Sequence, residues 1–422
     1  MTPDSNRHPV WYPYTQMAGI ADPIKIVSGK GALLFPEKGE PIIDAIASWW
    51  VNAHGHAHPY ISRKVFEQAQ KLEQVIFSGF THEPAETLAQ RLIDCTPAPL
   101  QHVFYSDNGS TAVEVALKMA WQYSLNSGKP RKKILALENS YHGDTVGAMS
   151  VSARSAFTRP FQDWLFDVHF LPPPYPGQEK SALAELDRFL KTHGNELAAF
   201  IYEPLVQGAS GMRMYSSDSL DDMLQMVKSS GALCIADEVM TGFWRTGSLL
   251  ASEQCSCLPD IICLSKALTG GFMPLGVTMA TSAIYDAFLG DWQSNTLFHG
   301  HSFTGNPLSC SAALASLDLF DHPDFQPQYQ SVICQQREFT SSIRNHPALQ
   351  DVRMQGTIVA LERKGESGYF SGNRNSAYQF FIENKVLLRP LGNVWYILPP
   401  YCITPHELAR VYEAILLGLS HK

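Results

Sequence analysis

Between about residue 100 and residue 281, short apolar runs alternate along the chain with stretches of helical periodicity. This alternation is typical of a mostly parallel β-sheet, because parallel strands need long connections and helices usually supply them. No other feature of the sequence constrains the fold as strongly, and it predicts an α/β architecture. We expect strands at His102–Ser106, Lys132–Glu138, Ala199–Glu203, Leu233–Asp237, Ile261–Ser265 and Gly276–Thr281.

The two ends of the chain predict a second, smaller domain. From about residue 305 onward the pattern changes to a long helix, a stretch of strand and loop, and a last helix with an apolar stripe. The first 55 or so residues contain strand-like pieces that we expect to join it. We therefore predict a large domain at residues 56–305 and a smaller domain built from residues 1–55 and 306–422. The strand-like pieces are Ile24–Val27, Ala32–Phe35 and Pro41–Ile46.

Charge and cysteine usage exclude several classes of protein. Lys and Arg total 32 against 40 Asp and Glu, and a net charge of −8 argues against a surface that neutralises nucleic-acid phosphates. The eight cysteines are scattered and include no Cys-x-x-Cys, as expected of reduced thiols. The N-terminus has no continuous apolar stretch, and no window approaches the roughly 18 apolar residues of a membrane span. We expect a cytoplasmic protein with no nucleic-acid or membrane partner.

Polar residues follow several of the predicted strands. Ligands of open α/β sheets bind beyond the carboxyl ends of the strands, and Asp107, Asp237 and Lys266 stand at such ends. Burial would lower the pKa of Lys266 and suit it to amine chemistry, although a lysine that extends out to solvent is the alternative. Asp237 could keep a pyridinium nitrogen protonated, or it could cap a helix. Because the two are 29 residues apart, one connection separates them and they can lie on neighbouring strands.

A candidate anion site follows the first predicted strand. The residues Asp107-Asn108-Gly109-Ser110-Thr111 connect this strand to an amphipathic helix predicted over Ser110–Tyr123, where Val113, Ala116, Leu117 and Ala120 recur at spacings of three and four. Glycine, hydroxyls and free amides at a helix N-terminus bind phosphate, but an ordinary capped helix has the same sequence features. Tyr141, after the next strand, could stack on a flat ring or belong to the core.

Three histidines near the N-terminus suggest a metal site at first sight. His54, His56 and His58 would share one face of a strand, and imidazoles bind zinc. However, Gly55 and Pro59 favour a bend, and no carboxylate or thiol accompanies the histidines. We predict no metal site.

Taken together, these motifs resemble those of the class III, fold-type I aminotransferases that use pyridoxal phosphate. The resemblance spans nearly the whole chain and implies a seven-stranded, mostly parallel sheet flanked by helices, with a smaller α+β domain built from both chain ends. The matching segments are Asp237, Lys266, the Asn-Gly-Ser turn, Tyr141-His142-Gly143-Asp144, Phe243-Trp244-Arg245-Thr246-Gly247 and His299-Gly300-His301-Ser302-Phe303.

The resemblance also implies roles for individual residues. Lys266 would hold the cofactor covalently and move the proton, and Asp237 would pair with the pyridine nitrogen. Tyr14 would join them among the catalytic residues. Tyr141 would stack on the cofactor ring, and Ser302 would extend from a partner subunit to the cofactor phosphate, which implies a homodimer with composite active sites. The remaining implied cofactor-binding residues are Gly109, Ser110 and His301. The implied substrate-binding residues are Tyr14, Trp50, Tyr141, Asp144, Arg245, Gly300, Arg389 and Tyr396.

Within this class, the chain is most similar to the aminotransferases that aminate 8-amino-7-oxononanoate in biotin synthesis, usually with S-adenosylmethionine as donor. The double tryptophan Trp49-Trp50, with Tyr14 and Arg389, carries this narrower resemblance. Two segments depart from the pattern of a known member: Gly300-His301-Ser302 stands where that member has Gly-Pro-Thr, and Gly242-Phe243-Trp244-Arg245 stands where it has Gly-Phe-Gly-Arg.

Other functions stay open at this stage. They are another class III ω-aminotransferase acting on ornithine, 4-aminobutyrate or a β-amino acid, the same acceptor with lysine as donor, and a binding protein that has lost its chemistry.

Overall fold

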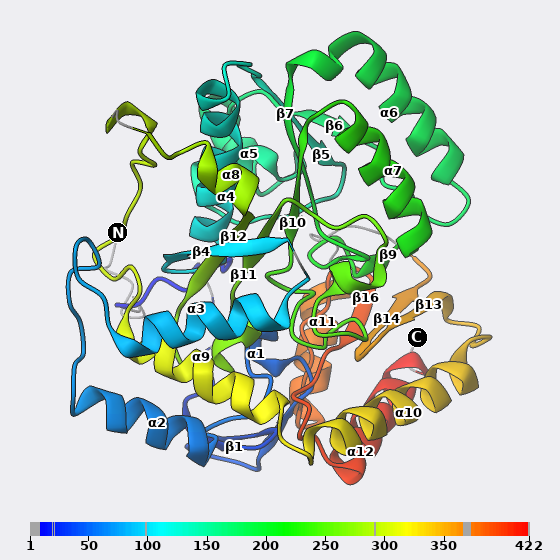
Figure 1. The fold of residues 1–422 in the computed structure, drawn as a ribbon. Coiled ribbons are helices and arrows are strands. Elements are labelled where there is room, and N and C mark those ends of the chain that lie inside the picture. The colour runs from blue at the N-terminus through cyan, green and yellow to red at the C-terminus, as the bar shows by residue number, and fades with distance from the viewer. Residues whose placement is uncertain are drawn as a thin grey trace, which may run out of the picture.

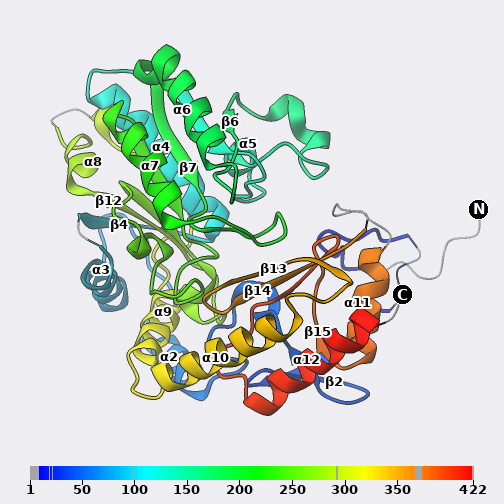
Figure 2. The same ribbon diagram turned by 90° about the vertical axis from the view of Figure 1, so that its right-hand side faces the viewer.

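The computed structural model describes residues 9–18, 20, 22–97, 99–290, 293–365 and 373–420. Its largest feature is a central sheet with helices around it, and a group of smaller sheets and long helices lies beside it (Figures 1 and 2). Among the described residues, no helix combines the length and the apolar character that a bilayer crossing requires.

The central sheet has seven strands in the order β4-β12-β11-β10-β7-β5-β6. Only β12 runs antiparallel to its neighbours within this sheet, so the predicted mostly parallel sheet is confirmed. Six of the strands match the runs predicted from the sequence, and β6 is too short to give a clear pattern. The strands are β4 (Leu100–Ser106), β5 (Lys133–Leu137), β6 (His169–Leu171), β7 (Leu197–Tyr202), β10 (Leu233–Asp237), β11 (Ile261–Leu264) and β12 (Gly276–Thr281).

Apolar side chains cover both faces of this sheet. Successive strand residues point to opposite faces, so Ile235 belongs to one buried cluster while its neighbours Cys234 and Ala236 belong to the other. Burial on both faces explains why the strands read as continuous apolar runs in the sequence. The surrounding helices are α2 (Pro59–Ala69), α3 (Glu83–Cys95), α4 (Gly109–Asn126), α5 (Val146–Val151), α6 (Glu179–His193), α7 (Ser217–Ser229), α8 (Ser282–Asp286) and α9 (Pro307–Phe320).

The two ends of the chain meet in a four-stranded sheet of order β1-β2-β3-β15. Its strands β1 (Ile26–Lys30), β2 (Leu33–Pro36) and β3 (Ile42–Asp44) come from the N-terminal region, and β15 (Val386–Leu387) pairs in parallel with β3. Both chain ends thus contribute to the smaller part, as expected, while the exact boundaries at residues 55 and 305 stay a prediction. The other elements are α1 (Ala47–Trp50), β8 (Val206–Gln207), β9 (Arg213–Met214), α10 (Phe325–Ile343), β13 (Leu349–Gln355), β14 (Ile358–Arg363), α11 (Asn373–Glu383), β16 (Val394–Ile397) and α12 (Pro405–Ser420).

Candidate active site

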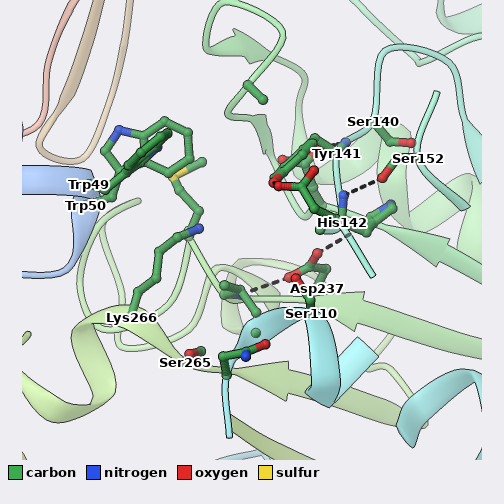
Figure 3. Close-up of a pocket in the computed structure, with 18 of the residues that line it drawn as sticks. Trp49, Trp50, Ser110, Ser140, Tyr141, His142, Ser152, Asp237, Ser265 and Lys266 are labelled. Atoms are coloured by element: carbon green, nitrogen blue, oxygen red, sulfur yellow. Dashed lines mark hydrogen bonds and ion pairs between the residues drawn. The ribbon is translucent and has the colours of Figure 1, made fainter. Parts of the chain in front are cut away.

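A cavity of about 770 Å³ lies where the carboxyl ends of the central strands face the smaller part of the protein. In Figure 3, Lys266 extends into it from one side while Tyr141 and Asp237 face it from the other. The central sheet and its helices contribute Gly109, Ser110, Tyr141, Asp144, Glu203, Asp237 and Lys266. The N-terminal and C-terminal regions contribute Tyr14, Trp49, Trp50, Arg389 and Tyr396.

Lys266 follows strand β11 and directs its amine into this cavity. Its Nζ lies 4.8 Å from the ring centroid of Trp50. Burial lowers the pKa of Lys266 to about 8, although the negative charges of Asp237 and Glu203 oppose this shift. A fraction of the amine is therefore neutral near neutral pH and available as a nucleophile. The alternative of a lysine that extends into solvent is wrong.

Asp237 ends the neighbouring strand β10, which pairs in parallel with β11, so the two predicted residues do lie on adjacent strands. The carboxylate is 4% exposed. Its Oδ2 lies 2.7 Å from Nδ1 of His142, and its Oδ1 accepts a hydrogen bond from the N–H of Val239. Turns, not a helix, follow Asp237, which excludes the helix-cap alternative. The site thus contains a buried carboxylate that a neighbouring imidazole orients.

The start of α4 presents its first-turn amides to the cavity. Asn108 and Thr111 form a capping box, in which each side chain bonds the backbone N–H of the other at 3.0 Å. This box does not use the N–H groups of Gly109 and Ser110, so the capped helix and the anion site are compatible. A Cβ on Gly109 would lie 2.7 Å from Val239 Cγ1, so only glycine allows this close approach.

Three polar side chains form one hydrogen-bonded group on the cavity wall. The hydroxyls of Tyr14 and Tyr141 lie 3.2 Å apart, and both donate to Oδ2 of Asp144. Burial is the largest cause that raises the pKa of Tyr141, so its hydroxyl stays protonated and can donate. The structure therefore brings Tyr14 together with Tyr141 and Asp144, although Tyr14 is more than 120 residues away from both in the sequence.

Aromatic rings and a guanidinium form another part of the cavity lining. The Arg389 guanidinium lies 4.8 Å from the ring centroid of Trp49. The indole N–H of Trp50 donates to the Tyr396 hydroxyl at 3.1 Å. An arginine that faces a cavity across an indole ring can receive a carboxylate.

Glu203 is a buried carboxylate of the site that our sequence analysis did not single out. It follows β7 and is 5% exposed. One oxygen accepts from the N–H of Tyr141 at 3.0 Å and the other from the N–H of Gly208 at 2.9 Å. Burial raises the pKa of Glu203 to about 7. The signal that could have found it was its place after an apolar strand, the same signal that pointed to Asp237.

Arg245 was expected in the substrate pocket, but the structure does not place it there. Its side chain is fully buried, and its terminal nitrogens donate to the carbonyl oxygens of Pro399 at 2.8 Å and Trp50 at 3.4 Å. Its guanidinium also lies 4.7 Å from the ring centroid of Tyr401. Trp244 packs against Phe325 and Tyr329 and is likewise absent from the cavity lining.

Gly300, His301 and Ser302 also lie outside the cavity lining of this chain. His301 lies 3.3 Å from Asp107 and 2.9 Å from His299, and the carbonyl oxygen of Ser302 accepts from Gln74. Their predicted contribution to a cofactor site requires a second subunit and stays a prediction.

The histidines near the N-terminus have separate partners. His54 bonds Ser316, and His56 bonds Asp44. No cluster of three or more histidine, cysteine, aspartate or glutamate side chains in the described part of the chain could hold a metal ion.

The family model and the similar proteins both indicate aminotransferases. Residues 16–417 match the family model of the class-III aminotransferases. The chain is 48% identical to the adenosylmethionine-8-amino-7-oxononanoate aminotransferase of Synechococcus elongatus, with 97% of this chain and 98% of that protein covered. It is 39% identical to the aminotransferase of the same name from Geobacter sulfurreducens, with coverage of 98% and 96%.

Solved structures show the same similarity. The adenosylmethionine-8-amino-7-oxononanoate aminotransferase of Methanocaldococcus jannaschii superposes with a TM-score of 0.92 at 35% identity and covers 97% of each chain. The PLP-bound form of an amine transaminase from an uncultivated Pseudomonas species superposes with a TM-score of 0.92 at 29% identity, covering 98% of this chain and 99% of the other.

Replacing Glu203 by glutamine should make stability less dependent on pH. The folded-state pKa of about 7 is above the ordinary value of 4.5, so the folded protein holds this proton more tightly and the stability it contributes is lost as the pH rises through 7. Between pH 4.5 and pH 8, Glu203→Gln should gain about 2–3 kcal/mol relative to the parent. Urea unfolding of both proteins across this range measures the difference. A constant difference between the two would show that Glu203 is ionised throughout.

Proposed function

The chain belongs to the class III aminotransferase family, and we propose that it aminates 8-amino-7-oxononanoate with pyridoxal phosphate as cofactor and S-adenosylmethionine as amino donor. The family membership makes it an aminotransferase of the expected fold. The relatives that carry the name of this reaction, at up to 48% identity over nearly the full length, support the choice of acceptor and donor. The observation in the structure that supports it is the Arg389 guanidinium over the Trp49 ring in the lining of the cavity.

The residues of the cavity fit pyridoxal phosphate. The first turn of α4 offers amides for a phosphate, because Gly109 and Ser110 line the cavity. Asp237 offers a buried anion for a ring nitrogen, and Lys266 offers a partly neutral amine for an aldehyde. When bound, the cofactor supplies an aldehyde that accepts the amino group and a ring that delocalises negative charge.

The side chains of this protein then have separate tasks. The Nζ of Lys266, with its lowered pKa, accepts and returns the proton at the reacting carbon. Asp237 would pair with the ring nitrogen of the bound cofactor and favour its protonated form, and the bond from His142 fixes the carboxylate in place. Tyr141 provides a flat surface for the ring, and Glu203 holds the backbone of Tyr141.

The acceptor is bound at the other end. Arg389 would pair with its terminal carboxylate, and Trp49, Trp50 and Tyr396 provide apolar surface for its aliphatic chain. The group Tyr14, Tyr141 and Asp144 offers hydrogen-bonding partners for the amino group of the acceptor. We do not include Arg245 in this proposal, because it does not line the cavity and its terminal nitrogens donate to the backbone carbonyl oxygens of Pro399 and Trp50.

We further propose a cytoplasmic homodimer whose subunits share their active sites. The loop 299–302 supports this, because Ser302 matches the family hydroxyl that reaches the partner's phosphate, while its own chain keeps it out of the cavity. Exposed Phe298 and Phe303 on both sides of the loop provide apolar surface for an interface. Eight free cysteines agree with a reducing compartment.

The experiment that tests the function is a donor screen. Purified protein and 8-amino-7-oxononanoate are incubated with S-adenosylmethionine, lysine, ornithine or 4-aminobutyrate, and 7,8-diaminononanoate is measured by mass spectrometry. We expect product with S-adenosylmethionine. Product with lysine alone would correct the donor, and no product with any donor would contradict the acceptor. Turnover of another keto acid would then identify a different ω-aminotransferase. The absence of any turnover would indicate a binding protein without catalytic activity.

Borohydride reduction should attach the cofactor to Lys266. The lowered pKa of this amine and its place in the cavity favour a bond to the aldehyde over every surface lysine. Reduction of the yellow protein followed by peptide mapping should find a pyridoxyl group on the peptide that contains Lys266. Lys266→Ala should bind the cofactor without this bond and lose transamination. A pyridoxyl group on another lysine would contradict the assignment.

Arg389→Ala should weaken the apparent binding of 8-amino-7-oxononanoate. A charged hydrogen-bonded pair contributes about 1.5–3 kcal/mol, which corresponds to roughly ten- to a hundredfold in affinity. Steady-state kinetics measures the acceptor effect, and single-turnover bleaching by the donor provides the control. A smaller change with donor than with acceptor supports separate carboxylate sites. Equal losses would indicate a site that both substrates share, and unchanged binding of both would remove Arg389 from recognition.

Mixing two inactive variants tests the composite site. Lys266→Ala and Ser302→Ala are each expected to impair both sites of a homodimer, the second by weakening phosphate binding. If Ser302 serves the partner's site, a mixed dimer carries both defects in one site and leaves the other intact, so activity should return on mixing. Failure to regain activity after verified subunit exchange, or an active monomer in light scattering, would contradict shared sites.

A further inference from the structure

The loop that carries Trp49 and Trp50 has a strained backbone. Ala47, Ser48 and Trp50 have φ angles of 49°, 60° and 68°, in the left-handed region that glycine normally occupies. A run of such residues persists only where the surroundings hold it in place. This strained loop presents one indole to Lys266 and the other to Arg389.

The carboxylate of Asp44 holds this loop through hydrogen bonds to its backbone. Its carboxylate is fully buried at the end of β3. Oδ1 accepts from the N–H of Ile46 at 3.1 Å, and Oδ2 accepts from the N–H of Ser48 at 2.7 Å. The carboxylate therefore replaces the backbone partners that a regular helix or strand would have supplied to these two amides.

His56 contacts the same carboxylate through its imidazole ring. Its Nε2 lies 2.8 Å from Asp44 Oδ2. Its backbone N–H donates to the carbonyl oxygen of Gly31 at 2.8 Å, and a Cβ on Gly29 would lie 2.6 Å from the Cβ of His56. The sheet of the smaller part thus fixes His56, and His56 fixes Asp44.

The same sheet also places Arg389. Strand β15 pairs in parallel with β3, with Leu387 opposite Asp44, and the N–H of Ala45 donates to the carbonyl oxygen of Leu387 at 3.2 Å. Carboxyl ends of parallel strands emerge side by side, so the tryptophan loop and Arg389 leave the sheet at the same edge. Asp44 therefore lies beside Leu387 at the ends of the two strands, and the chain continues from these ends to Trp49 and to Arg389.

We propose that Asp44 and His56 are positioning residues that hold Trp49 and Trp50 in register with Arg389 and so set the affinity for the carboxylate end of the acceptor. This inference rests on the proposed function for the identity of that acceptor. Neither residue lines the cavity, so they act through the loop and not on the substrate. The pair also gives His56, the middle histidine of the His54, His56 and His58 motif, a role other than metal binding.

Kinetics and amide exchange of holoenzyme variants test the proposal together. In His56→Ala, the KM for 8-amino-7-oxononanoate should rise about tenfold while kcat changes by less than about twofold, because β10 and β11 are untouched. Amides of residues 46–52 should exchange about fivefold faster, with residues 233–237 unchanged. His56→Gln, whose amide nitrogen can reach the position of Nε2, should restore both values toward those of the parent.

His58 offers a matched control. It lies two residues further on in the same motif, and its ring contacts His54 and makes no hydrogen bond within the described part of the chain. His58→Gln should leave KM and the exchange of residues 46–52 unchanged. If His56→Ala does not fold, His56→Asn, which is too short to reach Asp44 in the same way, replaces it.

Three results would overturn the proposal. They are parental KM and exchange in His56→Ala, equal defects in His56→Ala and His56→Gln, and faster exchange spread evenly over the protein. Failure of the unchanged enzyme to use 8-amino-7-oxononanoate would contradict the proposed function instead. The exchange arm needs no substrate, so it still decides whether His56 and Asp44 hold the loop.

Discussion

The site depends on the parallel pairing of β10 with β11, which brings a carboxylate and an amine to one buried edge. His142 and the N–H of Val239 bond the oxygens of Asp237 there, so this buried carboxyl group has hydrogen-bond partners. Lys266 is stabilised in its neutral form because burial outweighs the nearby negative charges. One buried edge thus combines an amine whose pKa is lowered to about 8 with a hydrogen-bonded carboxyl group, and amine chemistry near neutral pH needs such an amine.

The side chains that we propose for substrate recognition follow strands of a different sheet. The central sheet supplies the groups for chemistry, while the strands β3 and β15 of the smaller sheet end beside the Trp49 loop and Arg389. Residues that follow both sets of strands line the cavity. A division of this kind allows the recognition end to change in the course of evolution without moving Lys266 or Asp237, and it agrees with the similar folds of transaminases that have other names.

Strained backbone gathers around the cavity. Tyr14, Trp50, Asn139 and Lys266 all line it, and all have positive φ angles. Each such residue costs of order 1–3 kcal/mol, which the surrounding hydrogen bonds and packing must offset. Asp44 and Glu203 are buried carboxylates that bond backbone amides next to these residues or in the same loops. Their role is to hold side chains at angles that a relaxed backbone would not provide.

The sequence alone determined the central sheet, because strands buried on both faces are continuous apolar runs and their carboxyl ends are marked by polar residues. Lys266, Asp237 and the Asn108–Ser110 turn were predictable for this reason, and the resemblance to a family added Tyr14, Trp50 and Arg389. Only the tertiary structure decided that Glu203 belongs to the site and that Arg245 does not line it. Both are charged residues next to apolar runs. Glu203 accepts a hydrogen bond from the N–H of Tyr141, which is more than 50 residues away in the sequence. Arg245 donates to the carbonyl oxygen of Pro399, which is more than 150 residues away. Local sequence carries no record of such contacts, because they form only when distant strands and loops pack together.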